Sequence, residues 1–176
     1  MKHLSSVLFI STIALITFGC VKASVPPATQ ATQVEQHQCG GAVAQNDEQV
    51  LKGTTVMSVT PLYGHVHTSY NDYEARVNGA IINVQPPAGV TPDQMARVLQ
   101  CHSARALLGQ IDASQAANDP YWLPNSWVDI DVKPVVGGYA VTITADNVHN
   151  GLEVLARANS YAGKGSAPPT SIASTD

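Results

Sequence analysis

The sequence is poor in charge, and above all in positive charge. Asp, Glu, Lys and Arg make up only 12% of the 176 residues, and 13 acidic residues outnumber 9 basic ones. The formal net charge is therefore -4 at pH 7. A nucleic-acid-binding protein needs a basic patch to meet the phosphates. This chain offers no such patch, so we expect no nucleic-acid partner.

The motifs of the common catalytic classes are also missing. The sequence contains no G-x-S-x-G, no glycine-rich phosphate loop, no C-x-x-C and no H-E-x-x-H. Asp129 and Asp131 are close in sequence, but they alternate with Val128 and Ile130, as residues on the solvent face of a strand do. We therefore assign no catalytic residue and expect a protein that is not an enzyme.

The N-terminus carries a long hydrophobic run. Lys2 and His3 precede a stretch from Leu4 to Phe18 that is apolar except for serine and threonine residues. A bilayer-spanning helix needs about 20 apolar residues, so this run is too short to cross a membrane comfortably. A short basic start followed by such a run is typical of a secretory signal peptide. We predict a signal peptide over residues 1–19 and an exported protein.

The end of this run resembles the lipobox of bacterial lipoproteins. The motif is Thr17-Phe18-Gly19-Cys20, with a small residue before the cysteine, although leucine is usual at position 17. The resemblance implies a lipid on Cys20, and Val21 after it implies anchoring to the outer membrane of a Gram-negative cell, facing the periplasm. Ordinary cleavage after Ala23 is the alternative, and it would leave a soluble periplasmic or secreted protein.

The two flanks of the remaining chain differ in composition from its middle. Residues 20–50 are rich in Pro, Ala, Thr and Gln, which predicts a flexible tether. Residues 163–176 are mostly Gly, Ser, Pro and Thr, which predicts a disordered tail. Residues 51–162 have the length of one small domain.

The pattern of this domain predicts an α+β fold. Thr91 at the N-cap and Pro92 after it begin a helix that runs to about Leu108. A second helix follows Asp146 and ends near Ala162. The order is β-β-α-β-β-α, a two-layer sandwich with both helices on one face of a mostly antiparallel sheet. A ferredoxin-like arrangement with its last strand moved to the front satisfies this order, and a three-stranded sheet is the alternative. The predicted strands cover residues 55–60, 80–84, 128–133 and 139–144.

Residues 77–162 resemble small exported proteins and lipoproteins of Proteobacteria that have no established function. The resemblance lies in the Pro-x-Gly-x-Thr-Pro start of the central helix at residues 87–92, in Cys101-His102 with Arg105, and in the strand Trp127-Val128-Asp129-Ile130. It supports the domain boundaries and implies no mechanism.

Histidine and cysteine side chains form the one candidate metal site. His65 and His67 would lie on one side of an extended segment, and Cys101 and His102 lie on the central helix. Imidazole and thiolate suit Zn or Cu, provided that three or four of them converge. Two alternatives compete with this site. His102 can be a core residue, and Cys101 can form a disulfide with Cys39 in an oxidising compartment.

The connection between residues 110 and 126 is longer than most loops. Its aromatic residues Tyr121 and Trp122, together with Trp127, could contact a ligand or a partner protein of the envelope. The alternative is that Trp122 and Leu123 fold back and close the core.

These observations favour a membrane-tethered, non-enzymatic domain that binds a protein or a ligand without a cofactor. A periplasmic protein that binds Zn or Cu is the first alternative, and a small envelope hydrolase is the second.

Overall fold

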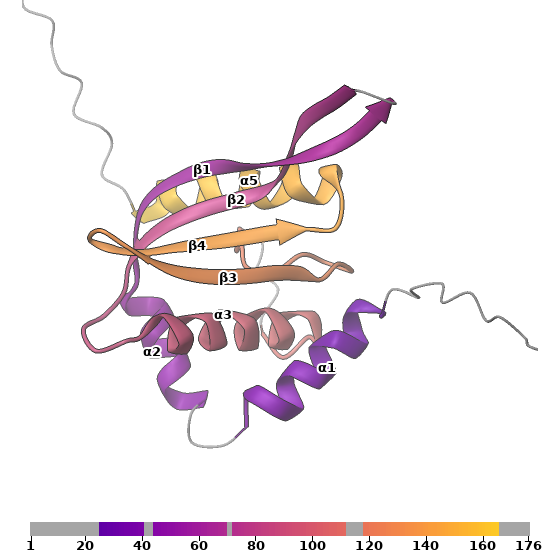
Figure 1. The fold of residues 1–176 in the computed structure, drawn as a ribbon. Coiled ribbons are helices and arrows are strands. Elements are labelled where there is room, and N and C mark those ends of the chain that lie inside the picture. Colours follow the sequence, from indigo (N-terminus) through magenta and orange to yellow (C-terminus); the bar gives the residue numbers. More distant parts are fainter. Residues whose placement is uncertain (1–24, 41–43, 70–71, 112–117, 166–176) are drawn as a thin grey trace, which may run out of the picture.

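The fold is seen in a computed structural model that describes residues 25–40, 44–69, 72–111 and 118–165 (Figure 1). Within these residues, no helix is both long and apolar enough to cross a membrane. The elements, in chain order, are α1 (Pro27–Gln38), α2 (Ala44–Gly53), β1 (Thr55–Ser69), β2 (Asp72–Gln85), α3 (Pro92–Leu107), β3 (Val128–Val135), β4 (Gly138–Ala145) and α5 (Val148–Gly165).

The sheet has the strand order β1-β2-β4-β3, and every neighbouring pair is antiparallel. Because β2 and β3 both run antiparallel to β4, they run parallel to each other. The β2-α3-β3 segment is therefore a split β-α-β unit with β4 inserted between its strands. This is the ferredoxin-like arrangement with its last strand moved to the front, as predicted. The three-stranded alternative is wrong, since β1 pairs with β2 along its length.

One face of the sheet and two helices form the core. The strand residues that point to this face alternate along each strand, as the two-residue period requires. Helix α3 contacts β3, and α5 contacts β2, β1 and β4, so both helices cover the same face. The opposite face carries Asp129 and Asp131, which are exposed as predicted. The core includes Ala80, Ile82, Val84, Val98, Leu99, Val128, Ile130, Val141, Ile143, Val154 and Ala158.

Helix α3 begins where the sequence predicts. The Thr91 hydroxyl accepts a hydrogen bond from the Gln94 backbone N–H at 3.2 Å, and Pro92 occupies the first helical position. The hydroxyl thereby satisfies one of the amide groups that the first turn leaves unpaired. The helix ends at Leu107, shortly before Gly109, whose φ of 70° is accessible to glycine at little cost.

Two glycines allow the close packing of backbone in the core. A Cβ on Gly79 of β2 would lie 1.9 Å from the Ile143 carbonyl oxygen on β4. A Cβ on Gly151 of α5 would lie 2.7 Å from the carbonyl carbon of Asn78. Helix α5 can therefore approach the β2 backbone only because position 151 carries no side chain.

The N-terminal segment corrects one prediction. Much of the tether predicted over residues 20–50 is helical, in α1 and α2, and α1 packs against α3 (Figure 1). Ala31 and Cys39 are buried. Ala and Gln are good helix formers, and Pro27 stands where proline is tolerated at a helix start, so this composition suits a helix as well as a linker. The signal peptide predicted over residues 1–19 and the predicted lipidation site Cys20 lie outside the described residues, and so does the predicted tail beyond residue 165.

Candidate functional site

A pocket of about 540 Å³ opens between α2, α3, the connection that follows α3, and α5. Pockets that hold small molecules have about this size. Leu51, Val98 and Ile111 supply apolar surface to its wall. The other lining residues are charged, polar or aromatic: Asp47, Glu48, Lys52, His102, Arg105, Gln110, Asp119, Tyr121 and Tyr161. Such a wall suits a ligand that has both an apolar and a polar part.

His102 and Asp119 form a fixed polar pair on the wall of this pocket. The His102 Nε2 atom is bonded to one carboxylate oxygen of Asp119, and the other oxygen accepts a hydrogen bond from the Tyr121 backbone N–H at 2.9 Å. The side chains of His102 and Asp119 are 19% and 10% exposed, so the pair is accessible from the pocket but mostly sheltered from solvent. An imidazole that donates its Nε2–H to a carboxylate keeps a lone pair on Nδ1.

Two tyrosine rings lie beside this pair. Tyr121 and Tyr161 meet edge to face, with ring centroids 5.9 Å apart. Burial raises the pKa of Tyr121 well above its ordinary value, and the nearby Tyr161 and Asp119 raise it further. Burial and the charge of Asp119 also raise the pKa of Tyr161. Both phenols therefore stay neutral at physiological pH.

These shifts predict a late phase in an alkaline titration. Tyr121 and Tyr161 should ionise only above about pH 10, the ordinary range of a tyrosine side chain. Because the folded state holds these protons longer than the unfolded chain, the stability contributed by the raised pKa values is present below about pH 10. It is lost as the pH rises through the folded pKa values. The ultraviolet absorbance of tyrosinate, followed as the pH is raised, measures the ionisation of these tyrosines.

One variant assigns the late phase of that titration. Tyr161→Phe should reduce it, because the pKa of Tyr161 is raised in the folded protein. A single phase that includes every tyrosine would contradict the burial of this pair.

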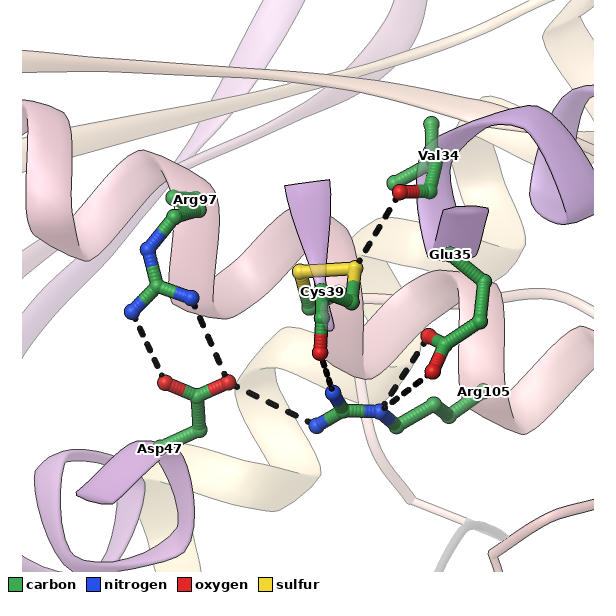
Figure 2. The surroundings of a disulfide bond; sticks show 7 residues. Val34, Glu35, Cys39, Asp47, Arg97 and Arg105 are labelled. Atoms are coloured by element: carbon green, nitrogen blue, oxygen red, sulfur yellow. Dashed lines mark hydrogen bonds and ion pairs between the residues drawn. A yellow bond between two sulfur atoms is a disulfide. The ribbon is translucent and has the colours of Figure 1, made fainter. Parts of the chain in front are cut away.

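Ion pairs tie α1 and α2 to the pocket side of α3 (Figure 2). Asp47 of α2 is bonded to Arg97 at 2.9 Å and to Arg105 at 3.5 Å. Arg105 also pairs with Glu35 of α1 at 3.2 Å, and its Nη2 donates to the Cys39 carbonyl oxygen at 2.9 Å. This network holds α2 in place as one wall of the pocket.

A disulfide joins Cys39 to Cys101 and fixes the end of α1 to the middle of α3 (Figure 2). This pairing is the one predicted from the sequence. Both cysteines are buried. Since Cys101 is held in the disulfide, it is not a thiolate that could bind a metal ion.

Among the residues whose side chains are described, the predicted metal ligands His65, Cys101 and His102 do not form a metal site. Within the described residues, no three or more His, Cys, Asp or Glu side chains are placed to hold a metal ion. His65 is exposed on β1, opposite Ala75 of β2, and His67 lies in the same strand, in a part whose side chains are outside the description. The strand predicted over residues 55–60 continues through Pro61 as far as Ser69 and so includes both histidines, because an edge strand tolerates proline.

The three aromatic residues predicted to form one contact surface, Tyr121, Trp122 and Trp127, lie in three different environments. Tyr121 is buried in the pocket wall. The Trp122 ring packs against the Arg157 guanidinium, with 5.6 Å between the cation and the ring centroid. Trp127 lines a separate groove beside α1. Leu123 is buried in the core, in agreement with the alternative in which this segment closes the domain.

Sequence reasoning missed several residues of the pocket. Asp119 lies in the connection after α3, where no periodic pattern marks it, and Tyr161 lies on the last turns of α5. Asp47 lies within residues 20–50, for which the sequence predicts a flexible tether. The only signal for Asp47 was the helix-forming composition of residues 44–53, which could have predicted that this segment is a helix. The contact of Asp47 with α3 is visible only in the structure.

Comparisons with protein families, with curated proteins and with solved structures find no match to this chain. The class of protein is therefore defined by the fold and the pocket, as a small α+β domain with a disulfide-linked helical arm.

Proposed function

We propose that this chain is an exported protein of the cell envelope whose folded domain binds a small organic molecule without converting it. The observation that carries the proposal is the His102–Asp119 pair on the wall of a pocket of ligand size. Two neutral tyrosines beside the pair add aromatic surface for an apolar part of the ligand.

The charges on the pocket wall favour a ligand with a cationic group. Asp47 is matched by two arginines, and Glu48 is paired with Lys52 at 2.7 Å. Asp119 has an imidazole as its partner in place of an arginine or lysine. An ammonium group could therefore neutralise Asp119, while Leu51 and Val98 contact its apolar body. The ligand class is a small amphipathic amine.

The ligand class can be tested with two probes of the same shape and opposite charge, phenethylamine and 3-phenylpropionate. In a heteronuclear NMR titration, phenethylamine should shift the backbone amide signals of His102, Asp119 and Tyr161, and 3-phenylpropionate should not. Asp119→Asn keeps the shape of the side chain and removes its charge. It should weaken the binding of phenethylamine about tenfold, because a hydrogen bond between charged groups is lost.

Asp129→Asn is the matched control, since it removes the same charge from the solvent face of β3. It should leave the affinity unchanged. Equal effects of the two variants, or binding of both probes alike, would argue against a ligand site at Asp119.

The proposed location rests on the hydrophobic N-terminal run, on the lipobox-like motif at Cys20, and on the disulfide. Disulfides persist in oxidising compartments such as the bacterial periplasm. We expect Cys20→Ala to abolish labelling of the protein by a radioactive fatty acid. Cys39→Ala should keep the label, because that cysteine belongs to the disulfide. Labelling that survives Cys20→Ala would reject the lipid anchor.

A further inference from the structure

A second, smaller groove lies between α1 and the start of β3. Its volume is about 310 Å³, and no residue lines both it and the pocket described above. One wall is a face of α1 that carries Gln30, Gln33, His37 and Gln38, and the other wall is Trp127. The α1 residues recur at the spacing that brings side chains to one face of a helix. The disulfide at the end of α1 holds this face in place.

The described lining of this groove contains no Lys, Arg, Asp or Glu. A glutamine amide offers two donors and an acceptor without net charge. Gln30 already donates to the Val25 carbonyl oxygen at 3.2 Å, whereas Gln33 and Gln38 are exposed. The groove is therefore unsuited to a strongly charged ligand, which would find no countercharge.

Trp127 adds a flat aromatic surface to these amides. Its indole Nε1–H donates to Asp129 at 3.3 Å, which orients the ring. A tryptophan ring is a large, rigid apolar surface with few internal rotations to lose when a ligand binds. An aromatic ring beside neutral hydrogen-bonding groups is complementary to a pyranose. The pyranose has an apolar face of C–H groups, which can stack on the ring, and hydroxyl groups around its edge.

We propose that this groove binds a neutral oligosaccharide. One sugar ring stacks on Trp127, and its hydroxyls exchange hydrogen bonds with the side-chain amides of Gln33 and Gln38. This site is independent of the amine pocket, because the two share no lining residue. The failure of either proposal would leave the other standing.

The probes are three neutral oligosaccharides: cellotetraose, maltotetraose and chitotetraose. The chain has two tryptophans, so an NMR spectrum of the labelled protein contains two indole N–H signals. At least one of the sugars should shift the signal of Trp127 and leave that of Trp122 in place. If none of the three shifts the Trp127 signal, or if both indole signals move together, the proposal is overturned.

Variants of the groove residues complete the test with the sugar that binds. Gln33→Ala should weaken binding about fivefold, the loss of about one hydrogen bond. Trp127→Ala should weaken it at least about tenfold, and Trp127→Phe, which keeps an aromatic surface, should weaken it less. Gln36→Ala is the matched control, because Gln36 lies on α1 outside the groove. Equal losses for the Gln33 and Gln36 variants would count against the site.

Discussion

Replacing Cys39 and Cys101 together by alanine should lower the free energy of unfolding by about 3 to 4 kcal/mol. The two cysteines are 62 residues apart, so the disulfide closes a long loop and strongly restricts the unfolded chain. It also ties α1, which buries little apolar surface apart from Ala31, to the central helix. Chemical denaturation of the purified variant measures the loss.

Two comparisons make this result specific. The wild-type protein in a reducing agent should show the same loss as the double variant, since both lack the cross-link. Cys20→Ala should unfold like the oxidised wild type. A double variant within about 1 kcal/mol of the wild type would mean that α1 is held by its packing and ion pairs alone.

Replacing Asp47 by asparagine is expected to lower the free energy of unfolding by about 2 to 3 kcal/mol. The Asp47 side chain is only 4% exposed, and its loss of charge removes the carboxylate that pairs with Arg97 and leaves Arg105 paired with Glu35 alone. Complete burial would make the cost higher, but the two arginine side chains are 25% and 18% exposed and keep some contact with water. Thermal and chemical unfolding both report this change.

The matched control for Asp47 is Asp131→Asn. Asp131 pairs with Lys133 at 2.9 Å on the solvent face of β3, where both side chains are largely exposed. Its replacement should change the stability by no more than about 0.5 kcal/mol. Arg97→Gln should also cost less in the Asp47→Asn background than in the wild type, because the two residues share one interaction. Additive effects of these changes would show that Asp47 and Arg97 are not coupled.

Local signals in the sequence predicted the central helix and all four strands, although β1 and β2 extend well beyond the predicted residues 55–60 and 80–84. Thr91 and Pro92 are residue types that favour a helix start, so they predict where α3 begins. Apolar and polar residues alternate along residues 128–133, which predicts one buried and one exposed face. Gly137 has a φ of 85°, which glycine adopts at little cost, and it allows the tight turn between β3 and β4. These features depend on neighbours along the chain, and for that reason they can be recognised without a structure.

The two N-terminal helices could not be recognised in the same way. Helix α1 has a single fully buried residue, Ala31, so it lacks the apolar stripe that usually marks a helix in a domain. Its position depends on contacts with residues more than 60 positions away, through the disulfide and through Arg105. The candidate site depends on such contacts too, because Asp119 bonds to His102 across a separation of 17 residues.

Ligand recognition at Asp119 is tested most directly by a crystal structure of the protein with phenethylamine. The proposed function predicts an ammonium group within hydrogen-bond distance of the Asp119 carboxylate, with the ring against Leu51 and Tyr161. An amine bound at other carboxylates, or a pocket that stays empty in crystals saturated with the amine, would contradict it.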